Sequence, residues 1–291
     1  MTTVWAIGDN TIDEYVGALT RRHIGGNAVN VAMQAALLGA DVHYAGAVGA
    51  DDDGTAVLRA LDEGGVGRER VVQDGSPTAL TRIRVTETGE RMFEQEIFGV
   101  TATYHPPPQV IAEATTADWV HLGMLADATR LRGELAAAGA SALVTQDCAV
   151  SAGHTDLDIA FESAGEDLDR ACHLAVTAIE GGARLAVVTL GALGATAFDG
   201  ATWWQQPAAP APVVDTTGAG DSFIAGFTLW FLEHRDVPKA MAAGAQAAAR
   251  TCSHYAGWPQ GDGRSYFNAM ALAVEPEPPT LFSGADVNRP S

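Results

Sequence analysis

The stretch VVDTTGAGDSFIAGF, residues 213–227, changes character twice. An apolar pair precedes the turn-forming run TTGAG, and beyond it the residues Phe223, Phe227 and Trp230 recur at helical spacing. The stretch therefore predicts a strand, a glycine loop and a helix in succession. Such a junction directs several backbone N–H groups and the positive end of a helix dipole at one point, which favours an anion. Asp221 lies at the predicted helix start, beside that point.

Strand-like and helix-like segments alternate along most of the chain. VWAIGD (4–9) is typical of a buried strand, GGNAVNVAMQAALLGA (25–40) of a helix that begins at glycines, and DVHYAGAVG (41–49) of the next strand. Further strand-like runs are DWVHL (118–122), ALVTQD (142–147) and LAVVTL (185–190), and a helical pattern covers 166–182. This alternation predicts an α/β fold with a mainly parallel sheet between two layers of helices. Ligands of such sheets bind at the carboxyl ends of the strands.

Residues 78–99 break the alternation. They carry two β-type runs around TETGE, which is a hairpin signal. A hairpin without flanking helices is expected to project from the sheet edge as a flap or as a dimer surface. Residues 275–291 are rich in proline and polar residues, a composition that predicts a poorly ordered tail.

Size and charge narrow the possible functions. The chain has 291 residues, of which 47% are hydrophobic, and can bury the core of one large α/β domain or two smaller ones. Its formal net charge of −19 repels nucleic acids and membrane surfaces, so neither is an expected partner. The same charge opposes an anionic substrate. A phosphate site must therefore be made favourable locally, by backbone N–H groups, a metal ion or a few arginines.

The N-terminus and the cysteines favour an ordinary cytoplasmic protein. MTTVWAIGDN has no basic region, and no run reaches the roughly 18 apolar residues of a membrane helix. Cys148, Cys172 and Cys252 lie far apart and form no C-x-x-C pair, which argues against a disulfide framework or a zinc knuckle. Buried free thiols are the expected state.

Polar side chains follow the first predicted strand and begin the first predicted helix. GDNTIDEY supplies Asp9 and Asp13, and GGNAVN supplies Asn27 and Asn30. Amides and carboxylates on strand-end loops suit a polyol, because each sugar hydroxyl both donates and accepts hydrogen bonds. Asn and Asp are also common loop formers, which explains each of them singly.

Together, GGNAVNVA, VGADDDG, VVTLGALGA and above all DTTGAGDSF resemble the ribokinase, or PfkB-type, carbohydrate kinase family. The matches occur in the family's order from about residue 4 to residue 260. The resemblance implies a single ribokinase-like αβα domain over residues 1–274. It also implies a β-flap, 78–99 with help from 12–17, that covers the sugar and pairs subunits in a homodimer.

The resemblance also implies roles for individual residues. Asp221 resembles the base for the acceptor hydroxyl, and the backbone N–H groups of Gly218, Ala219 and Gly220 resemble the anion hole for the transferring phosphoryl group. Chemistry agrees, because phosphoryl transfer depends mainly on positioning and charge neutralisation. The sugar-contacting positions of the family correspond to Asp13, Gly26, Asn27 and Asn30, and those of its nucleotide loop to Thr189, Gly191 and Gly194.

The family's cofactors are ATP and Mg²⁺, and many members also use a monovalent cation such as K⁺. Asp215 and Thr217 match the monovalent-cation loop. The magnesium-associated pattern N-x-x-E is SAGE here, so Ser163 replaces the usual asparagine while Glu166 is retained. Mg²⁺ keeps several waters in proteins, so a serine is tolerated at an outer position.

The segments IGDN with Asp13, GGNAVNVA and AFESA resemble most the fructoselysine 6-kinase branch, whose substrate is a sugar that carries an amino acid. Ribose, fructose and nucleoside kinases share most of the same motifs. Two alternatives come from other classes of protein. GDSF also resembles the block of GDSL-type hydrolases, with Ser222 as nucleophile, and a non-catalytic sugar-binding relative would keep the fold.

Overall fold

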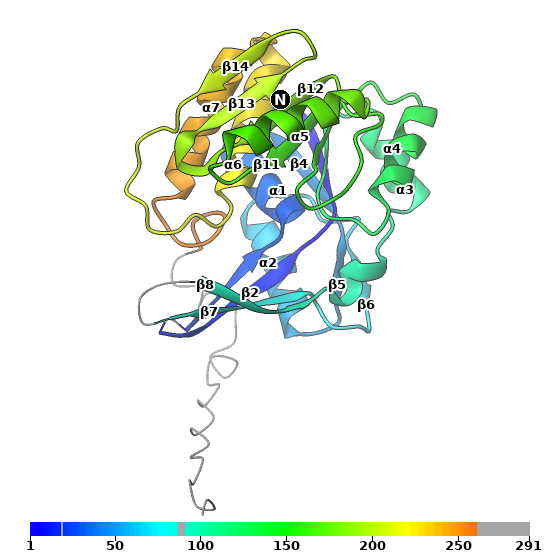
Figure 1. Ribbon diagram of the computed structural model, residues 1–291. Coiled ribbons are helices and arrows are strands. Elements are labelled where there is room, and N and C mark those ends of the chain that lie inside the picture. The colour runs from blue at the N-terminus through cyan, green and yellow to red at the C-terminus, as the bar shows by residue number, and fades with distance from the viewer. Residues whose placement is uncertain (19, 87–90, 261–291) are drawn as a thin grey trace, which may run out of the picture.

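The computed structural model describes residues 1–18, 20–86 and 91–260, and its centre is one eight-stranded sheet (Figure 1). In order across the sheet, its strands are β14 (Trp203–Gln206), β13 (Ala195–Phe198), β12 (Leu185–Thr189), β11 (Ile159–Ser163), β10 (Leu143–Asp147), β9 (Trp119–Leu122), β1 (Thr3–Ile7) and β4 (Asp41–Ala45). All neighbours from β4 to β12 pair in parallel, and β13 and β14 add an antiparallel edge.

Helices cover both faces of this sheet. One face packs against α1 (Asn27–Leu37), α2 (Asp52–Glu63), α6 (Ala219–His234) and α7 (Val237–Thr251), and the other against α3 (Pro108–Ala114), α4 (Ala128–Ala137) and α5 (Leu168–Glu180). Successive side chains of a strand point to opposite faces of the sheet. On β1, Val4 and Ala6 therefore belong to the core that includes α1 and α6, while Trp5 and Ile7 belong to the core on the other face. The predicted three-layer α/β fold is confirmed.

A second, four-stranded sheet forms the flap. Its order is β3 (Arg21–Gly25), β2 (Thr11–Gly17), β7 (Leu80–Val85) and β8 (Arg91–Ile97). Figure 1 shows it as a separate layer below the α/β body in that view. A short parallel pair, β5 (Ala47–Gly49) and β6 (Val72–Asp74), lies nearby. The predicted hairpin and segment 12–17 thus fall in one sheet, whereas β3 was not predicted, because Ile24 is the only large apolar residue in RRHIG.

Hydrogen bonds join the flap to the α/β body. The Tyr15 hydroxyl on β2 lies 3.1 Å from the Thr217 hydroxyl, in the loop that precedes α6. The Gln260 side chain accepts from the Ile24 N–H at 2.9 Å and donates to the Ile24 carbonyl at 2.7 Å. These bonds hold the flap next to the carboxyl ends of the parallel strands.

The predicted domain end at residue 274 and the predicted tail 275–291 lie outside the described residues. Within the described part of the chain, no helix combines the length and apolar character required to cross a bilayer. The cytoplasmic location stays a prediction.

Candidate active site

The glycine loop of residues 215–220 ends at the first turn of α6, as predicted. The strand predicted before the loop is not formed: Val213 and Val214 are exposed, at 70% and 44%, and lie outside the strands of the described residues. Gly218 is the N-cap residue and has a left-handed φ of 73°. A Cβ atom there would lie 2.3 Å from the Cα of Gly257, so both the conformation and the space require glycine. Among the described residues, the Gly218 and Gly220 N–H groups have no acceptor, while the Ala219 N–H donates to the Thr216 carbonyl at 3.2 Å. Two of the three predicted anion-hole N–H groups are therefore available to a ligand.

Two amides of α1 hold the Asp221 carboxylate. Asn27 Nδ2 donates to Oδ1 and Asn30 Nδ2 donates to Oδ2, each at 2.6 Å. The second N–H of the Asn27 amide donates to Asp147 Oδ2 at 2.8 Å, so one side chain bridges two carboxylates. Burial and the charge of Asp147 raise the pKa of Asp221 to about 8. Both asparagines, predicted to contact a sugar, thus lie against the predicted base.

Asp9 has a different role from that expected of a sugar contact. Its carboxylate accepts from the backbone N–H groups of Asn27 at 2.7 Å, Ala28 at 3.2 Å and Met124 at 2.9 Å. It therefore holds the amino end of α1, which begins after Gly26 with its φ of 103°. Asp9 fixes the start of the helix that carries both asparagines.

Asp13 and Asn30 keep polar atoms that a sugar can use. Asp13 lies on β2, and burial, with the charges of Asp215 and Asp9, raises its pKa to about 7. The Oδ1 atom of Asn30 is buried and has no hydrogen-bond partner among the described residues. Because a hydroxyl can donate to either group, the arrangement fits the predicted polyol contacts.

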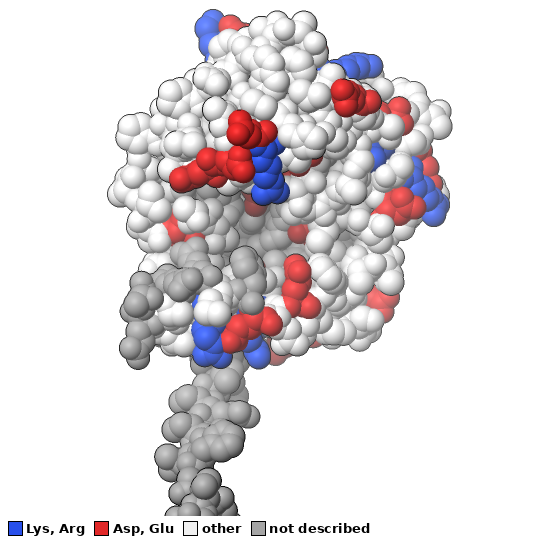
Figure 2. Space-filling view, viewed as in Figure 1, with Lys and Arg blue, Asp and Glu red and all other residues white. Residues whose placement is uncertain are grey.

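One cavity of about 760 Å³ lies at the carboxyl ends of β10, β11 and β12. Its lining includes the predicted nucleotide-loop residues Thr189, Gly191 and Gly194, the predicted metal-associated residues Ser163 and Glu166, and also Asp147, Glu162, Ala219 and Gly220. The nucleotide loop and the start of α6 therefore face one space. Figure 2 shows the surface hollowed between the α/β body and the flap, with acidic side chains around the hollow.

A second cavity, of about 900 Å³, lies at the amino ends of the parallel strands. Its lining includes Thr2, Asp118 and Arg184, which come directly before β1, β9 and β12. None of the predicted site residues lines it. The candidate site is therefore the cavity at the carboxyl ends.

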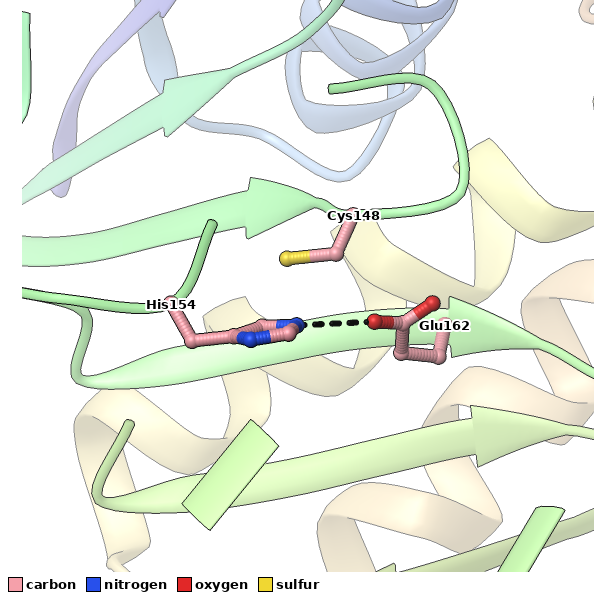
Figure 3. Close-up of side chains that lie close together, drawn as sticks. All are labelled: Cys148, His154 and Glu162. Atoms are coloured by element: carbon pink, nitrogen blue, oxygen red, sulfur yellow. Dashed lines mark hydrogen bonds and ion pairs between the residues drawn. The ribbon is translucent and has the colours of Figure 1, made fainter. Parts of the chain in front are cut away.

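Cys148, His154 and Glu162 meet beside this cavity (Figure 3). His154 Nε2 lies 3.0 Å from Glu162 Oε1, and all three potential ligand atoms lie within 4.8 Å of one another. Burial raises the pKa of the Cys148 thiol, so sulfur is protonated at neutral pH. A thiol is a soft ligand that Mg²⁺ disfavours, and the hydrogen bond from His154 holds Glu162 at the cavity wall.

Two further residues near Asp221 were missed in the sequence. Asp147 ends β10, and burial, with the charges of Asp9 and Glu162, raises its pKa to about 7. His121 lies on β9 and is fully buried. The rule that ligands gather at strand ends could have identified Asp147, whereas no local pattern marks His121.

Asp215, predicted to belong to a monovalent-cation loop, holds the backbone before α6. Asp215 accepts from the N–H groups of Thr217 at 2.8 Å and Ala256 at 3.2 Å, and so fixes the loop before α6. Its role toward a monovalent cation stays a prediction.

Ser222 is fully buried and its hydroxyl donates to the Gly218 carbonyl at 2.8 Å. A nucleophile must reach its substrate, so the hydrolase alternative is wrong.

Comparisons with known proteins agree with this geometry. The sequence model of the pfkB family carbohydrate kinases matches residues 14–98 and 108–257. The chain is 36% identical over 266 residues to a fructoselysine 6-kinase of Shigella flexneri, covering 89% of this chain and 100% of that protein. It is 30% identical over 261 residues to a fructosamine kinase of Bacillus subtilis, covering 86% of this chain and 90% of that protein.

Solved structures show the same fold. The Arabidopsis thaliana ribokinase complexed with ribose and ATP superposes with a TM-score of 0.76 at 22% identity, covering 93% of this chain and 98% of the other. A ribokinase of Thermotoga maritima gives a TM-score of 0.73 at 17% identity, covering 94% and 98%. The family match over most of the chain, the relatives at 30% and 36% identity and the shared fold lead to one conclusion: the chain belongs to the pfkB family of carbohydrate kinases and is an ATP-dependent sugar kinase.

Proposed function

We propose that the protein transfers the γ-phosphoryl group of ATP to a primary hydroxyl of a ketosamine, a sugar of the fructoselysine type. The carboxylate of Asp221, at the amino end of α6 and next to the nucleotide-side cavity, carries the catalytic part of this proposal. The acceptor oxygen bonds to the γ-phosphorus while the bond to the β,γ-bridging oxygen breaks. The hydroxyl proton passes to Asp221, and the N–H groups of Gly218 and Gly220 stabilise the transferring group.

The choice of a ketosamine rests on the named relatives and on one row of flap residues. Asp13 on β2 pairs with Thr81 on β7, and Thr81 pairs with Glu96 on β8. Paired residues of neighbouring strands share a face of the sheet, so Glu96 lies on the face of Asp13, about 10 Å away. Glu96 is exposed on that face. An ammonium group that extends from a sugar bound at Asp13 would reach a carboxylate there.

A substrate panel tests this choice. We expect fructoselysine to have the highest kcat/KM among fructoselysine, fructose, ribose and adenosine. Glu96→Gln should lower kcat/KM for fructoselysine by about threefold to fivefold, the range of an exposed ion pair, and leave fructose unchanged. The matched control is Glu94→Gln, because Glu94 pairs with Arg84 and not with the row of Asp13. A roughly hundredfold preference for ribose or adenosine would refute a ketosamine as the preferred substrate, but it would not contradict the assignment as a sugar kinase.

Mg²⁺ is the family's metal, and we propose that Glu166 acts on it or on its water shell. The Glu166 side chain is exposed on the cavity wall, beside Gly191 of the nucleotide loop. Glu166→Gln should raise the Mg²⁺ concentration at half-maximal rate by about threefold to tenfold, because it removes a full charge. Ser163→Ala, which removes only a weak dipole, should change it less. Superimposable magnesium titrations of the wild type and Glu166→Gln would exclude Glu166 from this role.

We further propose that K⁺ binds the loop of Asp215 and Thr217 and that two copies of the chain pair through the flap. β8 is an edge strand, and two exposed apolar residues lie on it or directly after it: Met92 on the strand, 52% accessible, and Phe98 after its end, 41% accessible. Exchange of K⁺ for tetramethylammonium in the assay tests the cation. Light scattering of the wild type and Phe98→Asp tests the dimer, since a 30.2 kDa species for the wild type would refute it.

A further inference from the structure

A buried line of hydrogen bonds runs from the middle of the sheet to Asp221. Trp119 Nε1 donates to the Thr145 hydroxyl at 2.8 Å, and that hydroxyl lies 2.9 Å from His121 Nδ1. His121 Nε2 lies 2.9 Å from Asn27 Oδ1, and the Asn27 amide then reaches Asp221. Trp119, His121 and Thr145 are each 0% exposed, so these side chains do not face the solvent.

The direction of each bond is fixed by what its ends can do. An indole N–H only donates, so the Thr145 oxygen accepts from Trp119, and the Thr145 proton goes to His121 Nδ1 when the ring proton is on Nε2. At the other end, both N–H groups of Asn27 face carboxylates, so its Oδ1 must accept a proton from His121 Nε2. Burial lowers the pKa of His121 to about 3, which leaves a neutral ring. The network therefore assigns the Nε2–H tautomer.

We propose that His121 is a positioning residue for phosphoryl transfer: it locks the Asn27 amide in the one orientation that donates to both Asp221 and Asp147. A rotated amide would place Oδ1 against a carboxylate oxygen, where both atoms are acceptors. The amide has no other lock at its oxygen, because Oδ1 bonds only to His121 among the described residues. The proposal concerns the base and holds for any sugar acceptor, so it does not depend on the ketosamine.

The consequence is a change in the protonation of the base. The Asn27 and Asn30 amides stabilise the charged form of Asp221, while burial and the charges of Asp147 on β10 and Asp9 after β1 oppose it. When Asn27 no longer donates, burial and the two carboxylates outweigh the remaining amide, and Asp221 keeps its proton to higher pH. A base that holds its proton cannot accept the one from the sugar hydroxyl. Catalysis then falls at neutral pH more than at alkaline pH.

Enzyme kinetics test the effect on catalysis. His121→Phe removes both ring nitrogens and keeps an aromatic side chain. We expect kcat at pH 7 to fall by about tenfold to a hundredfold, KM for ATP to stay within about twofold, and the acidic limb of kcat/KM to move up by about one pH unit. His121→Gln, which retains an N–H donor, should restore part of the rate. The matched control is His43→Phe on β4, where the ring stacks on Trp5, a residue of the core on the other face of the sheet from α1; it should behave as the wild type.

Two further measurements keep the proposal open to refutation if His121→Phe does not fold. Thr145→Val removes the hydroxyl that fixes the His121 tautomer and should shift the limb in the same direction, while Thr145→Ser should not. In the wild type, ¹⁵N chemical shifts of the His121 ring should show the Nε2–H tautomer with no titration between pH 5 and 8. An Nδ1–H tautomer, titration near pH 6.5, or a loss of kcat with an unmoved pH limb would each overturn the positioning role.

Discussion

Replacement of Asp221 with asparagine should lower kcat by about 10²–10⁴-fold while ATP binding and the fold persist. An amide has nearly the same shape as a carboxylate but cannot take the proton of the acceptor hydroxyl. Steady-state kinetics measure the loss, and calorimetric titration with ATP and the thermal midpoint show whether binding and folding are retained. Ser222→Ala is the matched control, since it alters the adjacent residue, which is buried and faces Gly218 and Thr251. It should leave kcat within a few-fold.

The pH dependence of kcat/KM is a second test of Asp221 as the catalytic base. Because burial and the charge of Asp147 raise the pKa of Asp221 to about 8, the base is mostly protonated in the free protein at pH 7. A base acts in its deprotonated form, so kcat/KM should rise with pH below about 8 and level off above it. The residual activity of Asp221→Asn should lack this limb. Near-wild-type kcat in that variant would contradict the assignment of the base.

Gly218→Ala should have the second largest effect, a loss of both stability and activity. Alanine at a φ of 73° is strained, and its Cβ would lie 2.3 Å from the Cα of Gly257, so backbone must move. We expect a destabilisation of about 1–3 kcal/mol. Because Gly218 begins α6, a shift of about 1 Å would displace the N–H groups and Asp221 together and lower kcat by about a hundredfold. Urea denaturation and kinetics of the same preparation measure both.

Alanine substitutions at two other glycines serve as controls that distinguish a steric effect on folding from an effect on catalysis. A Cβ atom added at Gly133 on α4 or at Gly220 on α6 would meet no atom within 4 Å beyond its chain neighbours and the backbone of its own helix, and neither residue has a left-handed φ. Gly133→Ala should be neutral or stabilising by up to about 1 kcal/mol and fully active. Gly220→Ala should also fold normally, so a loss of its activity would report close approach of the phosphoryl group. A Gly218→Ala protein as stable as the wild type would contradict the steric argument.

Alternating strand and helix patterns predicted the parallel sheet well, because strands buried on both faces form continuous apolar runs such as LAVVT. The edge strand β14 and the flap strand β3 were not predicted. β14, WWQQ, is half exposed, and β3 carries two arginines and a histidine, so neither has a pattern of its own. These strands form because a neighbouring strand supplies hydrogen bonds, which is information from distant parts of the chain.

The sequence by itself determined the glycine loop and the helix around Asp221, because turn and helix signals act over a few neighbouring residues, whereas the strand predicted before them finds no neighbouring strand to pair with among the described residues. Because ligands of a parallel sheet bind at the carboxyl ends of its strands, the sequence also predicted that the two amides of GGNAVN and the glycines of TLGALG lie at those ends. Only the tertiary structure decided that the amides of Asn27 and Asn30 bind Asp221 itself, that Asp147 shares the Asn27 amide, and that His121 lies beneath it. The physical reason is that hydrogen bonds and pKa values depend on distances of about 3 Å between residues some 100–200 positions apart, which no local pattern encodes.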